Sequence, residues 1–351
     1  MLKFADCVRK CAEVGASDLH ICAGYPPSMR HNGSLEAIDF EEPLTPAECT
    51  SLAYEILNPI QIDTLKKEGE IDFAFTVDDT RLRINVYQQS GTTAIAARLL
   101  RNEIPSIEDL ELPEALTNLR HKRHGLILVT GITGSGKSTT LAALVQLINK
   151  NFSNHIITIE EPIEYVYPKG KAIINQREIG TDCKSFANAL RAALREDPDV
   201  ILVGEMRDNE TIATALSAAE TGHLVLSTLH TIDVAGAVDR MIDSFPAHQQ
   251  SQIRTQIADV LECVVSQQLI PRIDKDGRVV ATELMLCNSA IRAHIREAKT
   301  FQIPNTISTS RKQGMMLMDD CIYELYVRGK ISGNSAVTFA HDREAMSKKV
   351  I

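Results

Sequence analysis

Short apolar runs recur in the second part of the chain, and each of them ends in polar residues. The runs cover residues 126–129, 156–159, 200–203 and 224–227. The stretches between them carry apolar residues at helical spacing, for example Leu141, Leu144, Val145 and Ile148. Apolar runs that alternate with helical patterns are typical of a mainly parallel sheet. The sequence therefore predicts an α/β fold for this part of the chain.

Residues 1–103 follow a different pattern. Phe4, Val8 and Cys11 recur at helical spacing, and the tetrad Thr45-Pro46-Ala47-Glu48 is a capping box with proline at the first helical position. Three segments with strand character follow. They cover residues 71–77, 81–88 and 92–99, and turn-forming residues separate them. We expect a small α+β domain in this region.

The two patterns predict how the chain is divided. After the α+β domain of residues 1–103 we expect a linker at residues 104–111, which contains one proline. The α/β core is expected at residues 112–287. From residue 288 to residue 351 the pattern is helical, with apolar positions such as Ile291 and Ile295 facing the core.

The most informative polar segment is Gly131-Ile132-Thr133-Gly134-Ser135-Gly136-Lys137-Ser138-Thr139, which fits the pattern G-x-x-x-x-G-K-[ST]. It follows an apolar run and precedes a helical pattern, so a chance glycine-rich turn is the weaker alternative. The glycines let backbone N–H groups approach phosphate oxygens. Lys137 can reach the β- and γ-phosphates, and the Ser138 hydroxyl can ligate Mg²⁺. We predict that Thr133, Gly134, Ser135, Gly136, Lys137, Ser138 and Thr139 bind ATP.

Three further strand ends carry carboxylates or a histidine. Glu160 and Glu161 follow the second run, Glu205 follows the third, and His230 follows the fourth. The carboxyl ends of strands form the ligand crevice of an open parallel sheet. Glu205 is predicted to coordinate the metal or to activate the attacking water. Neighbours in an extended segment point to opposite faces, so one of Glu160 and Glu161 should face the nucleotide. Which of the three carboxylates is the main base stays open.

Two histidines bracket the fourth run. His230 lies next to threonines at the crevice end and is predicted to sense the γ-phosphate. His223 is a weaker catalytic candidate. For both, the alternative is an ordinary hydrogen-bonding role at a strand end.

Composition narrows the class of protein. The 351 residues carry a net charge of −9 and include no tryptophan, which argues against a large surface for nucleic acid, so no nucleic-acid partner is expected. The eight cysteines form no C-x-x-C pair, which makes a zinc site unfavourable. Scattered thiols, no secretory signal and no apolar run of membrane-spanning length predict a cytoplasmic protein.

Several motifs together resemble those of the secretion-type hexameric ATPases, and in particular the type IV pilus retraction ATPases, the PilT family. Residues 195–208, which include Gly-Glu-Met-Arg-Asp, resemble the Walker B region. Residues 219–231 resemble the His box, and residues 158–164 resemble the Asp box. Near the N-terminus, residues 15–20 with Pro26-Pro27 also match. The resemblance covers nearly the whole chain.

The resemblance implies a PAS-like N-terminal domain, a RecA-like P-loop ATPase domain and a helical C-terminal region. It also implies a homohexameric motor that hydrolyses ATP with Mg²⁺ and powers pilus retraction, that is, pilin disassembly and twitching motility. Such a motor would act at the inner face of the cytoplasmic membrane through an inner-membrane platform protein. The alternatives are a pilus extension or type II secretion ATPase and, from another class, a nucleic-acid translocase. The extension and secretion relatives usually carry a tetracysteine zinc insert, which this sequence does not show.

Two motifs depart from the family's pattern. Glu161 stands where the Asp box usually has aspartate. The retraction-linked motif, Ala-Ile-Arg-Asn-Leu-Ile-Arg-Glu in the family, reads Ala-Ile-Arg-Ala-His-Ile-Arg-Glu at residues 290–297. Arg292, Arg296 and Glu297 are retained in it, whereas the central pair is changed.

The resemblance also implies how arginines complete the site. Arg81 and Arg83 are two residues apart in a strand pattern and should share one face, and Arg98 lies on the next strand. These three are expected to bind ATP and to stabilise negative charge as arginine fingers do, with a solvated sheet face as the alternative. Arg191 and Arg195, four residues apart on a predicted helix, are weaker candidates for contacting the nucleotide of a neighbouring subunit.

Overall fold

The computed structural model describes residues 2–38, 42–100 and 103–350, and the chain forms two compact units. The first unit comprises Met1–Glu103 together with the short segment Glu161–Val166. The second comprises Ile104–Glu160 and Tyr167–Ile351. Each unit has its own sheet and its own hydrophobic core, so each is described separately.

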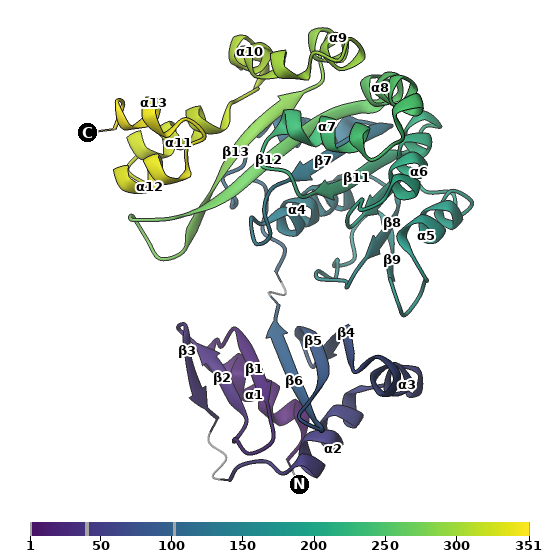
Figure 1. Ribbon diagram of the computed structural model, residues 1–351, viewed down its shortest axis with the longest axis vertical. Coiled ribbons are helices and arrows are strands. Elements are labelled where there is room, and N and C mark those ends of the chain that lie inside the picture. Colours follow the sequence, from purple (N-terminus) through teal and green to yellow (C-terminus); the bar gives the residue numbers. More distant parts are fainter. Residues whose placement is uncertain (1, 39–41, 101–102, 351) are drawn as a thin grey trace. The chain divides into compact units, whose positions relative to one another are not determined.

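The first unit contains a six-stranded antiparallel sheet with the order β3-β2-β1-β6-β5-β4 (Figure 1). The strands are β1 (Asp18–Ile21), β2 (Ser28–His31), β3 (Ser34–Ala37), β4 (Glu70–Val77), β5 (Thr80–Gln89) and β6 (Thr92–Leu99). The three segments predicted as strands are β4, β5 and β6, with shifts of at most one residue at their ends. The short strands β1, β2 and β3 were not predicted.

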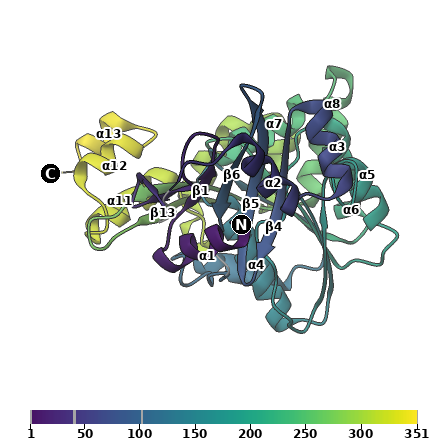
Figure 2. The same ribbon diagram turned by 90° about the horizontal axis from the view of Figure 1, so that it is seen from below.

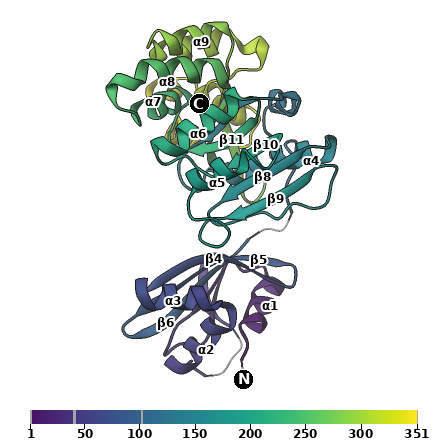
Figure 3. The same cartoon turned by 90° about the vertical axis from the view of Figure 1, so that its right-hand side faces the viewer.

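Three helices, α1 (Phe4–Val14), α2 (Pro46–Ile56) and α3 (Pro59–Glu68), lie on one side of this sheet (Figure 3). The predicted capping box begins α2, because the Thr45 side chain accepts from the backbone of Glu48 and the Glu48 side chain accepts in return from Thr45. Leu82, Ile84 and Val86 of β5 are buried in the same core as the helices. The alternate residues of β5 therefore lie on the opposite face.

The second unit contains a seven-stranded sheet with the order β13-β12-β7-β11-β10-β8-β9. Neighbouring strands are parallel except for β12 and β13, which form an antiparallel hairpin (Figure 1). The strands are β7 (Gly125–Thr130), β8 (His155–Glu160), β9 (Ile173–Glu178), β10 (Val200–Val203), β11 (Leu224–Leu229), β12 (Leu261–Pro271) and β13 (Arg278–Leu286). The α/β fold predicted from the alternating pattern is confirmed.

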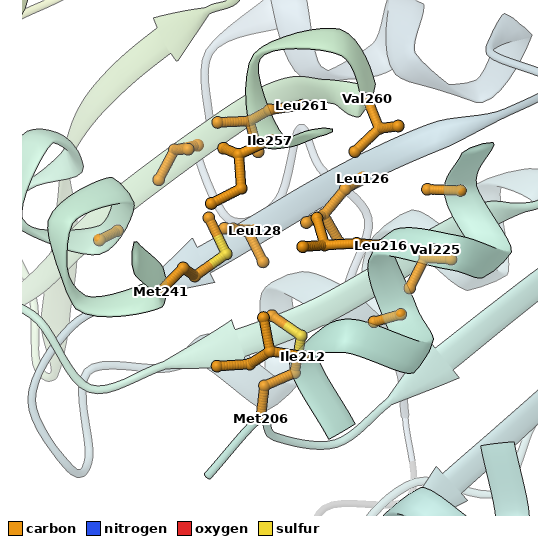
Figure 4. Close-up of a cluster of buried hydrophobic side chains, with 14 of the residues drawn as sticks. Leu126, Leu128, Met206, Ile212, Leu216, Val225, Met241, Ile257, Val260 and Leu261 are labelled. Carbon is orange, nitrogen blue, oxygen red and sulfur yellow. The ribbon is translucent and has the colours of Figure 1, made fainter. Parts of the chain in front are cut away.

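The central strands of this sheet are mainly apolar because both of their faces are buried. Leu126 and Leu128 of β7 pack into one core with Met206, Ile212 and Met241 (Figure 4). The intervening residues of the same strand pack into a second core on the other face. Parallel strands covered on both sides read as continuous apolar runs rather than as alternating ones, so the runs in the sequence mark β7, β8, β10 and β11.

Helices cover both faces of the second sheet. They are α4 (Lys137–Asn151), α5 (Phe186–Ala193), α6 (Asn209–Glu220), α7 (Val234–Asp243) and α8 (Ala247–Val260), with a 3₁₀ helix at Glu114–His121. Residues 104–111, expected to form a linker, belong to the second unit, and Ile107 among them is buried in the same core as Leu141 and Leu144 of α4.

After β13 the chain is helical, as the pattern of residues 288–351 predicted. The helices are α9 (Ser289–Arg296), α10 (Ile303–Thr309), α11 (Met318–Val327), α12 (Gly333–Phe339) and α13 (Arg343–Ser347). Helices α11, α12 and α13 gather beside the β12–β13 hairpin (Figure 2), where Met318 and Ile322 pack against Ile270 and Val279. Within the part of the chain that the structure describes, no helix combines the length and the apolar character needed to cross a bilayer.

Candidate nucleotide site

The predicted phosphate loop connects the end of β7 at Thr130 to the start of α4 at Lys137. Gly131 has a φ of 146°, and a Cβ there would lie 2.4 Å from the backbone oxygen of Gln267. A side chain is therefore excluded at this position both by conformation and by space. The loop ends at the N-terminus of a helix, where backbone N–H groups and the helix dipole favour an anion.

Lys137 is buried, with 8% of its surface exposed. Its ammonium donates to the backbone oxygens of Gly131 at 2.9 Å and Ile132 at 3.0 Å, so it lies along the inside of the loop. Ser138, one residue further along the first turn of α4, is exposed, and Thr139 is half-buried. The lysine and the serine hydroxyl thus begin the same helix, as a phosphate loop requires.

Gln267 of β12 supports the loop from beneath and was not predicted. Its Nε2 donates to the backbone oxygen of Ser135 at 2.7 Å, and its side chain is fully buried. Two buried polar atoms at this point, Ser135 Oγ and Gln267 Oε1, have no hydrogen-bond partner among the described residues. Such atoms are uncommon in folded proteins. A phosphate oxygen is a suitable acceptor for the Ser135 hydroxyl, so the loop fits a nucleotide.

The predicted carboxylates lie at the ends of neighbouring strands. Glu160 ends β8, and its Oε1 accepts from Thr158 Oγ1 at 2.7 Å and from Gln176 Nε2 at 3.3 Å. Glu205 lies two residues beyond β10. The N–H of Gly204 donates to the backbone oxygen of Ile159 at 2.8 Å, which continues the pairing of β8 and β10 up to these carboxylates.

Glu205 and His230 are in contact. Nε2 of His230 lies 3.2 Å from Glu205 Oε2, and the guanidinium of Arg207 pairs with the other carboxylate oxygen. The Glu205 side chain is 15% exposed, whereas that of His230 is 52% exposed. The strand ends on which they lie are joined, since Thr228 Oγ1 donates to Gly204 O at 2.6 Å. The structure therefore brings together two of the predicted catalytic side chains.

His223 lies elsewhere. It immediately precedes β11, and its backbone oxygen accepts from Gly125 at the beginning of β7. Because β7 and β11 are parallel and the phosphate loop follows the end of β7, His223 lies at the amino ends of these strands and Lys137 follows their carboxyl ends. Its Nδ1 lies 3.0 Å from the backbone oxygen of Ala218. This contact is of the kind expected from the hydrogen-bonding alternative, and the catalytic role of His223 stays a prediction.

Glu160 and Glu161 differ in surroundings. Glu160 belongs to the second unit, together with the phosphate loop, whereas Glu161 opens the segment 161–166 that belongs to the first unit. Glu161 is exposed and Glu160 is half-buried. Within the first unit, Arg81 donates from Nε and Nη2 to the backbone oxygen of Ile163 at 3.3 Å in both cases.

The three predicted arginines share one face of the first sheet. Arg83 and Arg98 are direct cross-strand partners on β5 and β6, and Arg81 lies two residues from Arg83. This face is opposite to the one that carries the buried Leu82. Arg83 pairs with Asp72 at 3.4 Å and Arg98 with Asp18 at 3.0 Å. The expected shared face is therefore present, and two of its cations, Arg83 and Arg98, pair with carboxylates of the same sheet.

The helix that was predicted to carry both Arg191 and Arg195 ends before Arg195. Helix α5 ends at Ala193, so Arg191 is helical and Arg195 lies in the turn beyond it. Asp197 has a positive φ of 55° and precedes Pro198, and a residue before proline disfavours helical backbone. Arg191 pairs with Glu210 of α6, and Arg195 is exposed. The two side chains therefore do not follow one another on a single helix.

The two arginines of the retraction-linked motif fasten α9 to α8. The guanidinium of Arg292 donates to the backbone oxygens of Ala258 and Asp259 and pairs with Glu262 at 2.8 Å. The guanidinium of Arg296 pairs with Asp259. The last backbone carbonyls of a helix have no partner within it, and a cation there is favourable. Arg292 thus caps the C-terminal end of α8.

A buried carboxyl that was not predicted lies at the start of α7. Glu283 of β13 is 4% exposed, and its Oε2 accepts from the N–H of Val234, the first residue of α7. Burial raises the pKa of Glu283 to about 7, the hydrogen bond from Val234 opposes this, and the nearby Asp233 and Asp319 add to the rise. A glutamate in a strand gives no sequence signal for this role, because it looks like an ordinary exposed charge.

The raised pKa of Glu283 predicts a pH-dependent stability. The folded protein holds this proton more tightly than the unfolded chain does. The carboxyl therefore contributes fully to the free energy of unfolding below its ordinary pKa of 4.5, and this contribution is lost as the pH rises through about 7. Glu283→Gln keeps an acceptor for Val234 without the charge. At pH 8 we expect this variant to be more stable by on the order of 2 kcal/mol, with the difference shrinking towards zero near pH 4.5.

Melting temperature measured across this pH range tests the expectation. Asp276→Asn, an exposed carboxyl in the β12–β13 turn, is the matched control and should show no comparable gain at pH 8. Equal melting of the wild type and Glu283→Gln at pH 8 would contradict the assignment.

Comparison with known proteins identifies the family. Residues 12–348 match the family model described as Type II/IV secretion system protein. The chain is 44% identical over 326 residues to the Type IV pilus retractation ATPase PilT of Pseudomonas aeruginosa, covering 93% of this chain and 94% of that protein. The chain belongs to the type II/IV secretion system protein family. The resemblance seen in the sequence to the pilus retraction ATPases is confirmed, and the chain is an ATPase of that family.

Two further similarities span the molecule. The chain is 47% identical over 302 residues to the Uncharacterized protein YggR of Escherichia coli, covering 86% of this chain and 91% of that protein. The solved structure of the pilus retraction motor PilT with bound ADP has a TM-score of 0.93 and 45% identity, and the match covers 99% of this chain and all of that one. The fold expected from the resemblance, an N-terminal domain followed by a RecA-like ATPase domain, is therefore confirmed, and the family uses an adenine nucleotide.

Proposed function

We propose that this chain is a motor that hydrolyses ATP to retract a type IV pilus. The observation that carries the proposal is the similarity to a pilus retraction ATPase over nearly the full length of both chains. The phosphate loop and the Glu205–His230 pair, which lie at the carboxyl ends of strands in one sheet, supply the chemistry of hydrolysis. Arg292 and Arg296, retained from the retraction-linked motif, hold α9 on α8 and support this direction of force.

In the proposed reaction the phosphate loop binds the triphosphate through its backbone N–H groups and Lys137. Ser138 and Glu205 have the oxygen ligands that Mg²⁺ prefers, and these two residues would hold the ion. When bound, Mg²⁺ would neutralise negative charge on the nucleotide. Glu205 orients or deprotonates the attacking water, and His230, held by Glu205, contacts the γ-phosphate. Glu160 is the second carboxylate of the site.

The assembly is proposed on the same resemblance. We infer a homohexamer that works at the inner face of the cytoplasmic membrane, bound there through an inner-membrane platform protein. Arg81, Arg83 and Arg98 supply further positive charge to the nucleotide, since ATP carries more negative charge than one lysine and one Mg²⁺ balance. Arg191 and Arg195 are proposed to contact the nucleotide of a neighbouring subunit. Glu161 is proposed as the remaining acidic residue of the Asp box.

Deletion of the gene in the bacterium that encodes this chain tests the direction of force. We expect more surface pili in the deletion strain, because pili that extend are then no longer withdrawn, and we expect twitching to be lost. Electron microscopy of pilus number is the measurement, and complementation with the wild-type gene is the control. Loss of pili would instead indicate an extension motor, and an unchanged number of pili would reject both roles.

A further inference from the structure

Thr130 is the last residue of β7 and directly precedes the phosphate loop. It is fully buried and pairs in the parallel ladder with Leu229, the last residue of β11. Beyond this pair the two strands separate, one into the phosphate loop and the other into residues 230–233, which carry His230 and are called the histidine loop here. Backbone pairing alone therefore ends at the point where the two functional segments begin.

The side chain of Thr130 extends the connection by two residues. Its Oγ1 accepts from the N–H of Thr231 at 2.9 Å and lies 2.7 Å from Thr231 Oγ1. It also lies 2.9 Å from the backbone oxygen of Thr231 and 3.1 Å from that of Leu229. A hydroxyl has one proton and two lone pairs, so Thr130 Oγ1 can donate one hydrogen bond and accept others from these groups. All of these contacts are made to the residues on either side of His230.

Side chains of β12 and β13 also hold the histidine loop. Ser266 Oγ of β12 donates to the backbone oxygen of Ile232 at 2.8 Å, and Glu283 of β13 accepts from Val234 at the loop's end. Both act on the part of the loop that leads into α7. Thr130 acts on the part next to His230, and it is covalently joined to Gly131 of the phosphate loop.

We propose that Thr130 is a positioning residue that couples the phosphate loop to His230 and, through the contact of His230 with Glu205, to the hydrolytic step. A shift of the phosphate loop at its first residue is passed to the histidine loop through a single side chain. Loss of the hydroxyl should leave the backbone N–H groups that bind phosphate intact, because β7 and α4 do not depend on it. It should release His230, and the chemical step should slow while nucleotide binding persists.

This inference rests on the proposed role of His230 and Glu205 in hydrolysis, and the test uses matched variants of the purified full-length protein. Thr130→Val has nearly the shape of threonine without the hydroxyl, and Thr130→Ser keeps the hydroxyl. We expect kcat for ATP hydrolysis to fall by about tenfold or more in Thr130→Val, while the affinity for a fluorescent ADP analogue stays within about twofold. In Thr130→Ser both quantities should stay within about twofold of the wild type.

A double-mutant cycle with His230→Gln separates a positioning role from general support of the fold. If Thr130 acts through His230, the double variant Thr130→Val, His230→Gln is no slower than His230→Gln alone. The proposal would be overturned if the reductions in kcat of the two single variants multiplied in the double variant. It would also be overturned by unchanged turnover or a loss of ADP-analogue binding in Thr130→Val, or by wild-type turnover in His230→Gln.

Two further points keep the test decisive. If Thr130→Val does not fold, Thr231→Val approaches the same contact from the half-buried partner side and should lower kcat without weakening nucleotide binding, and unchanged kcat there would overturn the proposal. Failure of the retraction proposal would appear in pilus number and would leave these turnover measurements unaffected, so the two failures are distinguishable.

Discussion

Lys137→Ala is expected to abolish ATP turnover in a protein that still folds. The ammonium of Lys137 is held on the backbone oxygens of Gly131 and Ile132, beside the N-terminus of α4, where we propose that phosphates bind. Removing the cation that is proposed to face the β- and γ-phosphates should lower kcat by about a thousandfold or more. Phosphate release by the purified protein is the measurement.

The matched control is Lys150→Ala, which removes an exposed lysine from the last turn of the same helix. That variant should hydrolyse ATP at the wild-type rate. A Lys137→Ala protein with a wild-type melting temperature and near-normal turnover would refute the assignment of the phosphate loop.

Glu205→Gln should keep nucleotide binding but slow hydrolysis by on the order of a hundredfold or more. The side chain keeps its shape and can still accept a hydrogen bond from His230, but it loses the charge that is proposed to organise Mg²⁺ or to activate water. Single-turnover hydrolysis together with binding of an ADP analogue separates the two effects.

The variant Glu160→Gln tests whether Glu160 or Glu205 is the main base. Its control is Glu220→Gln, which removes a negative charge from the exposed end of α6. If Glu160→Gln cripples the enzyme while Glu205→Gln barely changes the rate, Glu160 is the principal base.

The parts of the fold that the sequence predicted well are those with strong burial on both faces. Strands β7, β8, β10 and β11 lie between two cores, so a mainly apolar run is the pattern expected of them. The phosphate loop was equally clear, because Gly131 and Lys137 are required by geometry that few other residues satisfy. The capping box of α2 was local chemistry between Thr45 and Glu48 and needed no tertiary information.

The parts that the sequence did not predict depend on contacts between distant segments. Gln267 supports the phosphate loop from a strand whose polar residues, Ser266 and Gln267, face inward and mask its apolar pattern. Glu283 is an ordinary charge until β13 places it at the start of α7. The sequence ranked His230 above His223 only by its position at the end of an apolar run, and the direction of β11 shows that the two lie at opposite ends of this strand. Nothing in the linear pattern shows that residues 161–166 join the first unit.

Helix α8 passes into β12 without an intervening loop, since Val260 ends the helix and Leu261 begins the strand. A loop would have provided slack in which a displacement of the helix could be lost. Here the junction is clamped from the side by Arg292, and the strand that leaves it carries Gln267 to the underside of the phosphate loop. A displacement of α8 is therefore expected to reach β12 directly, and we expect a load applied to α9 to be transmitted through these two elements to the residues that support the phosphate loop.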